Sequence, residues 1–338
     1  MTLPQLEISY PETVVDACRL LEAGSEATQA IAGGTDLLMS LKDGQKQPDL
    51  IVDLWGVPGL SRIEYDPGKG LQIGALVTLG QLIRNRDVLS HYPVLAQAAG
   101  QVGSVQLQGM ATIGGNLCQD SCCVYFNRPE EVRLSLPPCH KLGGNTCHVV
   151  PSSADCWAPY TGDLAPVLMA LGGTVTVAGR NGEKVRPIAE IFTGDGSRPV
   201  DLGAGRLITK IMCPSPARHS GAVYFKLRPR ETLDYAVVGV AVSLSLNAED
   251  SRCENAAVIL TGVGRAPLAV AEAEELKGRK VTAEAIERIA KAATKLSHPV
   301  KSVSGTEPGY RRNMVKVHVE RGLSVSLEAA MASIGDGT

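Results

Sequence analysis

Cysteine is the residue type in this sequence whose spacing most clearly indicates chemistry. The chain of 338 residues contains nine cysteines, and most of them gather between positions 118 and 156. The gathered residues are Cys118, Cys122, Cys123, Cys139, Cys147 and Cys156. The first residues do not have the pattern of a secretory leader, so we expect a cytoplasmic, reducing environment in which disulfides are rare. A site in which thiolates bind a metal is therefore the favoured explanation of the group.

The spacing supports a four-thiolate site but leaves its metal open. Structural zinc usually takes its ligands in close pairs, and only Cys118 with Cys122 (or Cys123) forms such a pair. From Cys123 onward the cysteines are single and separated by 15, 7 and 8 residues, which is also unlike the compact ferredoxin run. Turn-forming residues surround them, so we predict one long loop held together by four metal bonds. His140 and His148 are expected to face solvent as bystanders, because four thiolates fill a tetrahedral site.

Two glycine pairs offer backbone that a ligand can approach closely. The first lies in Ala32-Gly33-Gly34-Thr35-Asp36, and the second lies in Thr112-Ile113-Gly114-Gly115-Asn116. Glycine N–H groups at the start of a helix bind anions, and we predict that Thr35 or Asp36 caps the helix after the first pair. Neither pair matches the dinucleotide motif G-x-G-x-x-G or the phosphate loop G-x-x-x-x-G-K-[ST]. Taken singly, such a pair is commonly only a turn.

The helices and strands that must position these residues can be predicted from the sequence pattern, which indicates an α+β protein in three parts. Residues 1–57 alternate helix and strand. An amphipathic helix follows Pro11 and ends at Gly24, and short strands at 30–31 and 50–54 come after it. Residues 58–215 hold short strands and helices, interrupted by the cysteine loop at about 117–161. Residues 216–338 hold antiparallel strands and then helices, and residues 335–338 are expected to fray. Further predicted strands cover 71–73, 174–177, 207–212, 224–227, 236–246 and 256–260, and predicted helices cover 94–99, 164–170, 268–276, 283–296 and 310–323.

Composition excludes several kinds of partner. Lys and Arg (33) nearly balance Asp and Glu (35), so no polyanion-binding field is built in and we expect no nucleic acid. Aromatic residues make up only 4%, too few for base-stacking platforms. No apolar run is long enough to suggest a membrane span. The sequence also has no nucleophile elbow, H-E-x-x-H motif or obvious acid–base pair, so we predict no catalytic residue for substrate chemistry.

Together these segments resemble the flavin-binding subunit of the molybdenum hydroxylases, the family of xanthine dehydrogenase and aerobic carbon monoxide dehydrogenase. The resemblance runs from about residue 4 to residue 325. Besides both glycine pairs it includes Ile73-Gly74-Ala75 with Thr78, Gly162-Asp163-Leu164-Ala165-Pro166, and Arg230 with Asp234. It implies a PCMH-type FAD-binding fold, with a small βαβ subdomain and a mixed or antiparallel sheet subdomain. A C-terminal α/β domain of antiparallel strands and helices would follow.

The same resemblance implies FAD as a cofactor, with its diphosphate at the two glycine pairs. We expect Asp163 to bind the cofactor rather than to transfer protons. Lys226 and Arg230 leave two alternatives, since a strand-borne cation either neutralises the diphosphate and flanks the flavin ring or belongs to a solvated strand face. The predicted cofactor-binding residues are Ala32, Gly33, Gly34, Thr35, Asp36, Thr78, Thr112, Gly114, Gly115, Asn116, Asp163, Lys226 and Arg230.

The cysteine loop is an insertion that ordinary members of this family lack. It resembles the insertion in the beta subunit of the 4-hydroxybenzoyl-CoA reductases, which carries a [4Fe–4S] cluster. By this resemblance Cys118 and Cys122 are not ligands, although spacing alone does not separate Cys122 from its neighbour Cys123. The implied ligands are Cys123, Cys139, Cys147 and Cys156.

The resemblance also implies an electron-transfer subunit of a larger oxidoreductase. Electrons would pass from ferredoxin through the cluster and FAD to [2Fe–2S] clusters and a molybdenum cofactor, which lie on a small and a large partner subunit. The expected assembly is a dimer of heterotrimers that reduces 4-hydroxybenzoyl-CoA to benzoyl-CoA during anaerobic degradation of aromatic compounds. Two alternatives stay open. One is the flavin subunit of another hydroxylase, with electrons leaving through the loop, and the other is a zinc-stabilised scaffold subunit without redox work.

Overall fold

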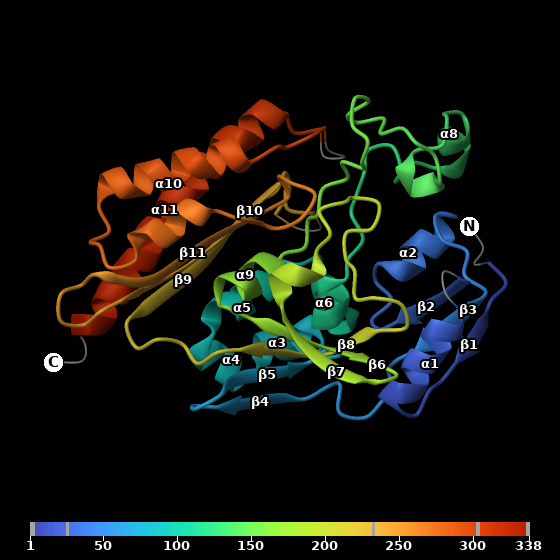
Figure 1. Cartoon of the computed structure of the whole chain (residues 1–338), viewed down its shortest axis with the longest axis horizontal. Coiled ribbons are helices and arrows are strands. Elements are labelled where there is room, and N and C mark those ends of the chain that lie inside the picture. Colours follow the sequence, from blue (N-terminus) through green and yellow to red (C-terminus); the bar gives the residue numbers. More distant parts are fainter. Residues whose placement is uncertain (1–3, 25–26, 232–233, 302–304, 336–338) are drawn as a thin grey trace.

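Three β-sheets organise the chain, and they follow one another along the sequence (Figure 1). The computed structural model describes residues 4–24, 27–231, 234–301 and 305–335. The expectation that the tail frays concerns mainly residues 336–338, which lie outside this range. The division that we propose, at residues 57 and 215, places one sheet in each part.

The first sheet is parallel and has the strand order β1-β3-β2. Its strands are β1 (Glu7–Ser9), β2 (Thr28–Ile31) and β3 (Leu50–Asp53), and the helices α1 (Val14–Gly24) and α2 (Leu37–Lys42) connect them. The buried residues of α1, Ala17 and Cys18, pack with Val52 of β3 in a small core. This confirms the predicted βαβ unit, because parallel strands require a crossover of this kind.

The second sheet is antiparallel, in the order β4-β5-β8-β6-β7. Short helices pack with it in the largest core, where Ile73 of the sheet joins Leu95 and Leu164 of the helices. The strands are β4 (Ile63–Asp66), β5 (Gly70–Gly74), β6 (Thr174–Gly179), β7 (Gly182–Pro187) and β8 (Leu207–Cys213). The helices are α3 (Leu79–Arg84), α4 (Arg86–His91), α5 (Pro93–Gly100), α6 (Val105–Met110), α7 (Ile113–Leu117) and α9 (Leu164–Ala170), and the 3-10 turn η3 (Ile188–Ile191) follows β7.

The cysteine loop leaves the second part after α7 and returns at α9, and its middle lies near α2 (Figure 1). It contains the helix α8 (Glu130–Leu134) and the 3-10 turn η2 (His140–Leu142), so it is more ordered than the sequence predicts. Arg133 of α8 donates a hydrogen bond to the carbonyl of Asp43 at 2.7 Å, which ties the loop to the end of α2. Protein contacts therefore hold part of this loop. Its small core contains Cys123, Phe126, Cys156 and Ala158.

The third sheet is antiparallel, in the order β12-β11-β10-β9, and the two longest helices, α10 and α11, pack with it (Figure 1). The helix predicted over 268–276 is wrong at its start, because Leu268 and Ala269 pair with β11. The helix predicted over 310–323 is part of a longer one. The elements are β9 (Ser220–Leu227), β10 (Val238–Leu246), β11 (Cys253–Thr261), β12 (Leu268–Ala269), the 3-10 helix η4 (Ala271–Leu276), α10 (Ala283–Leu296) and α11 (Pro308–Gly335).

The predicted fold class, α+β with antiparallel strands and helices in the C-terminal part, is confirmed by these three sheets. Across the described ranges, no helix combines the length and the apolar character that crossing a bilayer would take.

A buried arginine joins the C-terminal part to the middle of the molecule. The Arg311 guanidinium, on α11, donates hydrogen bonds to the carbonyls of Val237 (2.9 Å), Val300 (2.6 Å) and Gly262. The planar, forked guanidinium suits several carbonyls at once. The N–H of Gly262 in turn donates to the carbonyl of Tyr160 at 2.9 Å. The loop after β11 is thereby held against the segment that leads into α9.

Candidate functional site

The two glycine pairs meet at one cavity of about 450 Å³. Its wall includes the turn between β2 and α2, the helix α7 and the start of α9. Ten of the thirteen predicted cofactor residues line it: Ala32, Gly33, Gly34, Thr35, Asp36, Thr112, Gly114, Gly115, Asn116 and Asp163. Thr78, Lys226 and Arg230 are not among the described lining residues. The fold thus gathers residues far apart in sequence, while their contact with FAD stays a prediction.

The first glycine pair brings the N-terminal part against the second part. A Cβ atom on Gly33 would lie only 1.9 Å from the carbonyl oxygen of Met110, at the end of α6, so no side chain fits there. Gly34 has φ +68°, a conformation that glycine adopts without strain. The turn therefore presents bare backbone to the cavity, which is what close approach to a diphosphate requires.

The second pair lies in the short helix α7, which packs on the segment that follows β5. The N–H of Gly114 donates to the carbonyl of Ala75 at 2.9 Å, and the N–H of Gly115 donates to the side chain of Thr112 at 3.1 Å. Thr112 also forms a β-bridge with Thr78. Thr78 caps α3 through a capping box with Gln81, so its visible contacts are structural.

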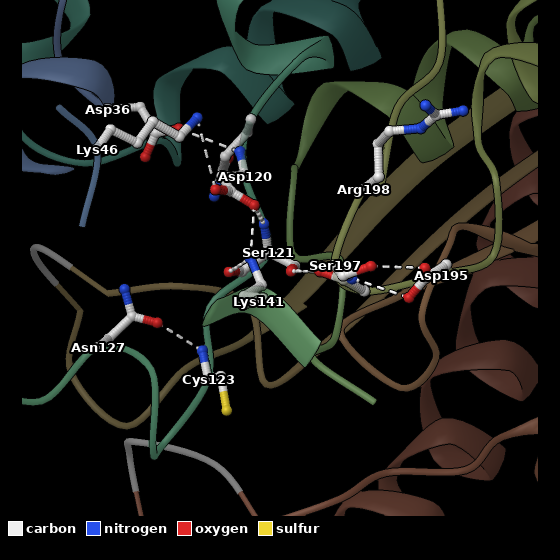
Figure 2. A network of polar contacts seen from close by, with 12 residues as sticks. Asp36, Lys46, Asp120, Ser121, Cys123, Asn127, Lys141, Asp195, Ser197 and Arg198 are labelled. Carbon is white, nitrogen blue, oxygen red and sulfur yellow. Dashed lines mark hydrogen bonds and ion pairs between the residues drawn. The ribbon is translucent and has the colours of Figure 1, made fainter. Parts of the chain in front are cut away.

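Asp36 has a different partner from the one that the sequence predicts. It occupies the N-cap position of α2, but among the described residues its carboxylate accepts no capping hydrogen bond from that helix. It accepts one instead from the N–H of Asp120, in the cysteine loop, at 3.0 Å (Figure 2). The prediction that Asp36 caps the helix is therefore wrong. Burial raises the pKa of Asp36, and the N–H of Asp120 opposes that rise.

Asp163 sits in a buried network between the second and third parts. Its carboxylate accepts a hydrogen bond from the Tyr224 hydroxyl at 2.6 Å and pairs with the Lys226 ammonium at 2.9 Å. Lys226 also donates to the carbonyl of Gln101 at 2.9 Å. Burial raises the pKa of Asp163, while Lys226 and Tyr224 oppose that rise. Lys226 is thus a buried partner of a residue in the cavity wall, and the solvated strand face is the wrong alternative for it.

Arg230 lies beyond the end of β9 rather than on the strand, and its side chain is 72% exposed. It pairs with Asp234 at 2.9 Å, and Asp234 and Tyr235 line the cavity. Sequence reasoning missed several other lining residues, because no local pattern marks them. These are Lys46, Cys118, Gln119, Arg206 and Tyr235.

The four predicted cluster ligands lie near one another in the loop. Cys123, Cys147 and Cys156 are buried, and Cys139 is half-buried. Electrostatic interactions link Cys123 to Cys139 and link Cys156 to both Cys123 and Cys147. Burial raises the pKa of Cys123 and also raises that of Cys156, to about 11. Such thiols stay protonated at neutral pH unless a metal displaces the proton.

The neighbouring cysteine Cys122 has other contacts. It is hydrogen-bonded to the side chain of Tyr235, in the cavity wall, whereas Cys123 packs with Phe126 and Cys156. This placement favours Cys123 over Cys122 as the first ligand.

The two histidines of the loop differ in their contacts. His148 Nε2 lies 2.8 Å from the carbonyl oxygen of Pro137. His140 Nε2 is buried and has no hydrogen-bond partner among the described residues. The expectation that both histidines face solvent is therefore wrong for His140.

The described side chains do not form a ready single-ion site. Among them, no three His, Cys, Asp or Glu residues lie close enough together to hold one metal ion. Tetrahedral zinc with bonds of about 2.3 Å would draw its sulfur atoms to roughly 3.8 Å from one another. A four-iron cluster binds each thiolate at a separate iron and needs a wider set. Neither the zinc site nor the cluster gains support from this arrangement of the described side chains, and both stay predictions.

Comparison with known proteins identifies the family. The chain matches the FAD-binding domain of molybdopterin dehydrogenases over residues 4–216 and the CO dehydrogenase flavoprotein C-terminal domain over residues 223–325. It is 27% identical over 288 residues, 84% of either chain, to the nicotinate dehydrogenase FAD-subunit of Eubacterium barkeri. It is also 27% identical over 331 residues to subunit alpha of the 6-hydroxypseudooxynicotine dehydrogenase complex of Paenarthrobacter nicotinovorans, covering 98% of this chain and 97% of that one. A structure of CO dehydrogenase from Oligotropha carboxidovorans superposes with a TM-score of 0.79 at 23% identity, over 97% of this chain and 100% of that chain.

These two domains in this order define a flavin subunit of an oxidoreductase of the molybdenum hydroxylase type. The chain belongs to this family, and its fold is a PCMH-type FAD-binding domain followed by the C-terminal domain of CO dehydrogenase flavoproteins. The predicted family, fold and FAD cofactor are therefore confirmed. The finer assignments, to a cluster and a substrate, are argued below.

We predict that Lys226→Met destabilises the protein by about 3–5 kcal/mol, because it leaves the Asp163 carboxylate buried without its cation. Burial already raises the pKa of Asp163, and removal of Lys226 raises it further, so the loss is expected to shrink as the pH falls and protonation removes the stranded charge. Urea unfolding of the wild type and the variant at several pH values measures this loss of stability. The control is Lys291→Met, which breaks an exposed pair with Glu287 and should change the free energy of unfolding far less. A cost for Lys226→Met no larger than the control would contradict the buried network.

Proposed function

We propose that this chain is the FAD- and [4Fe–4S]-containing electron-transfer subunit of a molybdenum enzyme that reduces 4-hydroxybenzoyl-CoA. The observation that carries the flavin part is the convergence of ten predicted residues on one cavity. The cysteine loop beside that cavity carries the cluster part. No residue of this chain is assigned a role in substrate chemistry, which we place on a partner subunit.

The residues of the cavity suit a dinucleotide. The absence of side chains at Gly33-Gly34 and Gly114-Gly115 lets the diphosphate approach the main chain closely. The Lys46 ammonium, in the same wall, adds a positive charge. The Asp36 carboxylate, whose charge would repel the phosphates, accepts a hydrogen bond from the N–H of Asp120, and burial raises its pKa. When bound, FAD accepts electrons singly or in pairs and so joins one-electron and two-electron chemistry.

The cysteine set fits an iron–sulfur cluster in its chemistry. Four thiols linked to one another by electrostatic interactions supply the ligand type that such clusters take. Phe126 and Ala158, both almost fully buried, pack beside Cys123 and Cys156 and exclude water from that side. A cluster there would exchange single electrons with a donor.

Two candidate functions of the complex are supported by different observations. The inserted loop resembles that of the 4-hydroxybenzoyl-CoA reductases, which favours reduction of that substrate with electrons entering from ferredoxin. The second candidate is a hydroxylase with electrons leaving the flavin, and it is favoured by relatives whose names describe nicotinate and CO dehydrogenases. Because of this loop, we propose the reductase rather than the hydroxylase.

We propose a large molybdenum subunit and a small [2Fe–2S] subunit as partners, in a dimer of heterotrimers. Several relatives are named as medium chains or as subunits of complexes, which supports an assembly of this kind. Because the proposed chemistry needs a molybdenum centre that this chain does not supply, activity is expected only from the assembled complex.

The intact complex should convert 4-hydroxybenzoyl-CoA to benzoyl-CoA, with two electrons from reduced ferredoxin and two protons releasing one water. Product formation by liquid chromatography measures this, and omission of ferredoxin is the control. Oxidation of nicotinate or a related N-heterocycle with no dehydroxylation would select the second candidate instead.

Gly115→Val is expected to lower bound flavin from about one per chain to less than about a tenth. The new side chain would enter the cavity, and its Cβ would lie 2.9 Å from the hydroxyl oxygen of Thr112. Flavin absorbance per chain is the measurement. Gly109→Val is the matched control, since a Cβ there meets no atom within 4 Å and Gly109 does not line the cavity. Unchanged flavin in Gly115→Val would refute the diphosphate position.

Cys139→Ser should remove the cluster while FAD stays bound, because the glycine pairs lie outside the loop. Iron analysis is expected to fall from about four per chain to near zero. Cys122→Ser, next to a predicted ligand, should retain its iron. Loss of flavin together with iron in Cys139→Ser would show that flavin binding depends on an intact loop and would contradict this prediction. Iron loss in Cys122→Ser would make that residue the first ligand.

A further inference from the structure

The loop places a buried cation, Lys141, between the cysteines and the cavity. The side chain of Lys141 is only 3% exposed, and its ammonium lies 2.7 Å from Asp120 Oδ1 and 3.1 Å from the carbonyl oxygen of Ser121. The same ammonium sits over the ring of Phe126, 4.9 Å from its centroid. Burial of a lone ammonium is costly, so this placement needs a compensating negative charge.

The contacts of Asp120 connect this cation to both functional regions. Its N–H binds the Asp36 carboxylate in the cavity wall, and its own carboxylate also lies 3.7 Å from the Lys46 ammonium. Figure 2 shows Asp36, Lys46, Asp120 and Lys141 as one connected group, with Cys123 farther along the same backbone. One Asp120 carboxylate therefore serves two ammonium groups, and Lys141 is the one that burial shields from solvent.

The Lys141 ammonium lies over the ring of Phe126, which packs with Cys123 and Cys156, so its charge stands close to two of the predicted ligands. It opposes the rise that burial causes in the pKa of Cys123 and of Cys156, and it does the same for Cys122. Asp120 carries the opposite charge and raises the pKa of Cys122. The loop thus carries a fixed cation and its counter-charge within electrostatic reach of its thiols, in a poorly solvated place where charges interact strongly.

We propose that Lys141 is a positioning residue that raises the reduction potential of the metal centre held by Cys123, Cys139, Cys147 and Cys156. This inference rests on the proposed [4Fe–4S] function. If these cysteines bind a cluster, its one-electron reduction by ferredoxin would add one negative charge to a centre that four thiolates already make negative. A nearby fixed ammonium stabilises the reduced form more than the oxidised form, and net charge is one of the factors that set such potentials.

A purely structural role for Lys141 makes a different prediction. If the ammonium only held the loop in place through Asp120, its loss would make the loop less stable but would not shift the reduction potential in a predictable direction. Asp120→Asn separates the two roles, since it keeps the Lys141 charge and removes the counter-charge. The electrostatic role therefore predicts shifts of opposite sign for Lys141→Met and Asp120→Asn.

The experiment uses the assembled complex and begins with iron and flavin content of the wild type and each variant. A redox titration followed by electron paramagnetic resonance then gives the midpoint potential at fixed pH. Lys141→Met is expected to weaken cluster reduction about tenfold, which is about 59 mV downward for one electron. Lys141→Arg should stay near the wild type. Lys46→Met, which removes a more exposed partner of Asp120, should shift the potential much less. Asp120→Asn should shift it upward.

An unchanged potential in an iron-replete Lys141→Met variant overturns the inference. If Lys141→Met fails to assemble, an unchanged or lowered potential in Asp120→Asn overturns it as well. A wild-type complex without iron is recognised at the first step, and it defeats the proposed cluster rather than the role of Lys141 within it.

Discussion

The close approach of two backbone segments, made possible by Gly33, is the constraint on which the cavity depends. At this point the turn after β2 passes so near the carbonyl of Met110 that even a methyl group would collide with it. The contact sets the distance between the N-terminal sheet and the helices of the second part. Because α7 follows α6 directly along the chain, the second glycine pair lines the same cavity as the first. A binding surface of bare backbone is thus a consequence of packing between two parts of the protein.

A buried carboxylate couples this surface to the C-terminal domain. Asp163 begins α9 and lines the cavity, but the groups that make its burial tolerable, Tyr224 and Lys226, come from β9. Arg311 adds a second tie, since it holds the loop whose Gly262 contacts Tyr160. The C-terminal domain therefore supports the cavity wall by holding Asp163 in place. This explains why a domain with few lining residues of its own matters to the site.

The sequence was informative where a local pattern decides the structure. Ala283–Leu296 is a helix with the predicted bounds, and the glycine pairs lie where bare backbone is needed. Prediction failed where a distant partner decides. Asp36 looks like a helix cap, but a loop residue more than eighty positions away binds it. The strand pattern leaves Lys226 between two alternatives, and only the buried Asp163 beside it excludes the solvated one. Lys141 carries no motif at all, because its role comes from Asp120 and Phe126 folding around it. Leu268 and Ala269 have a helical pattern, but pairing with β11 overrides it.

The position of the cysteine loop explains how so long a connection is accommodated without disturbing the cavity. Its two ends are already fixed, because the Tyr160 hydroxyl donates to the carbonyls of Asn116 and Leu117, each at 3.2 Å. With the ends held together by the fold, the entropic cost of a longer connection grows only slowly with its length. Both ends also border the cavity, where Asn116 and Asp163 stand in the wall. Any centre bound by the loop is therefore delivered beside the flavin site, and the Asp120 contacts with Asp36 and Lys141 fix how the loop lies against it.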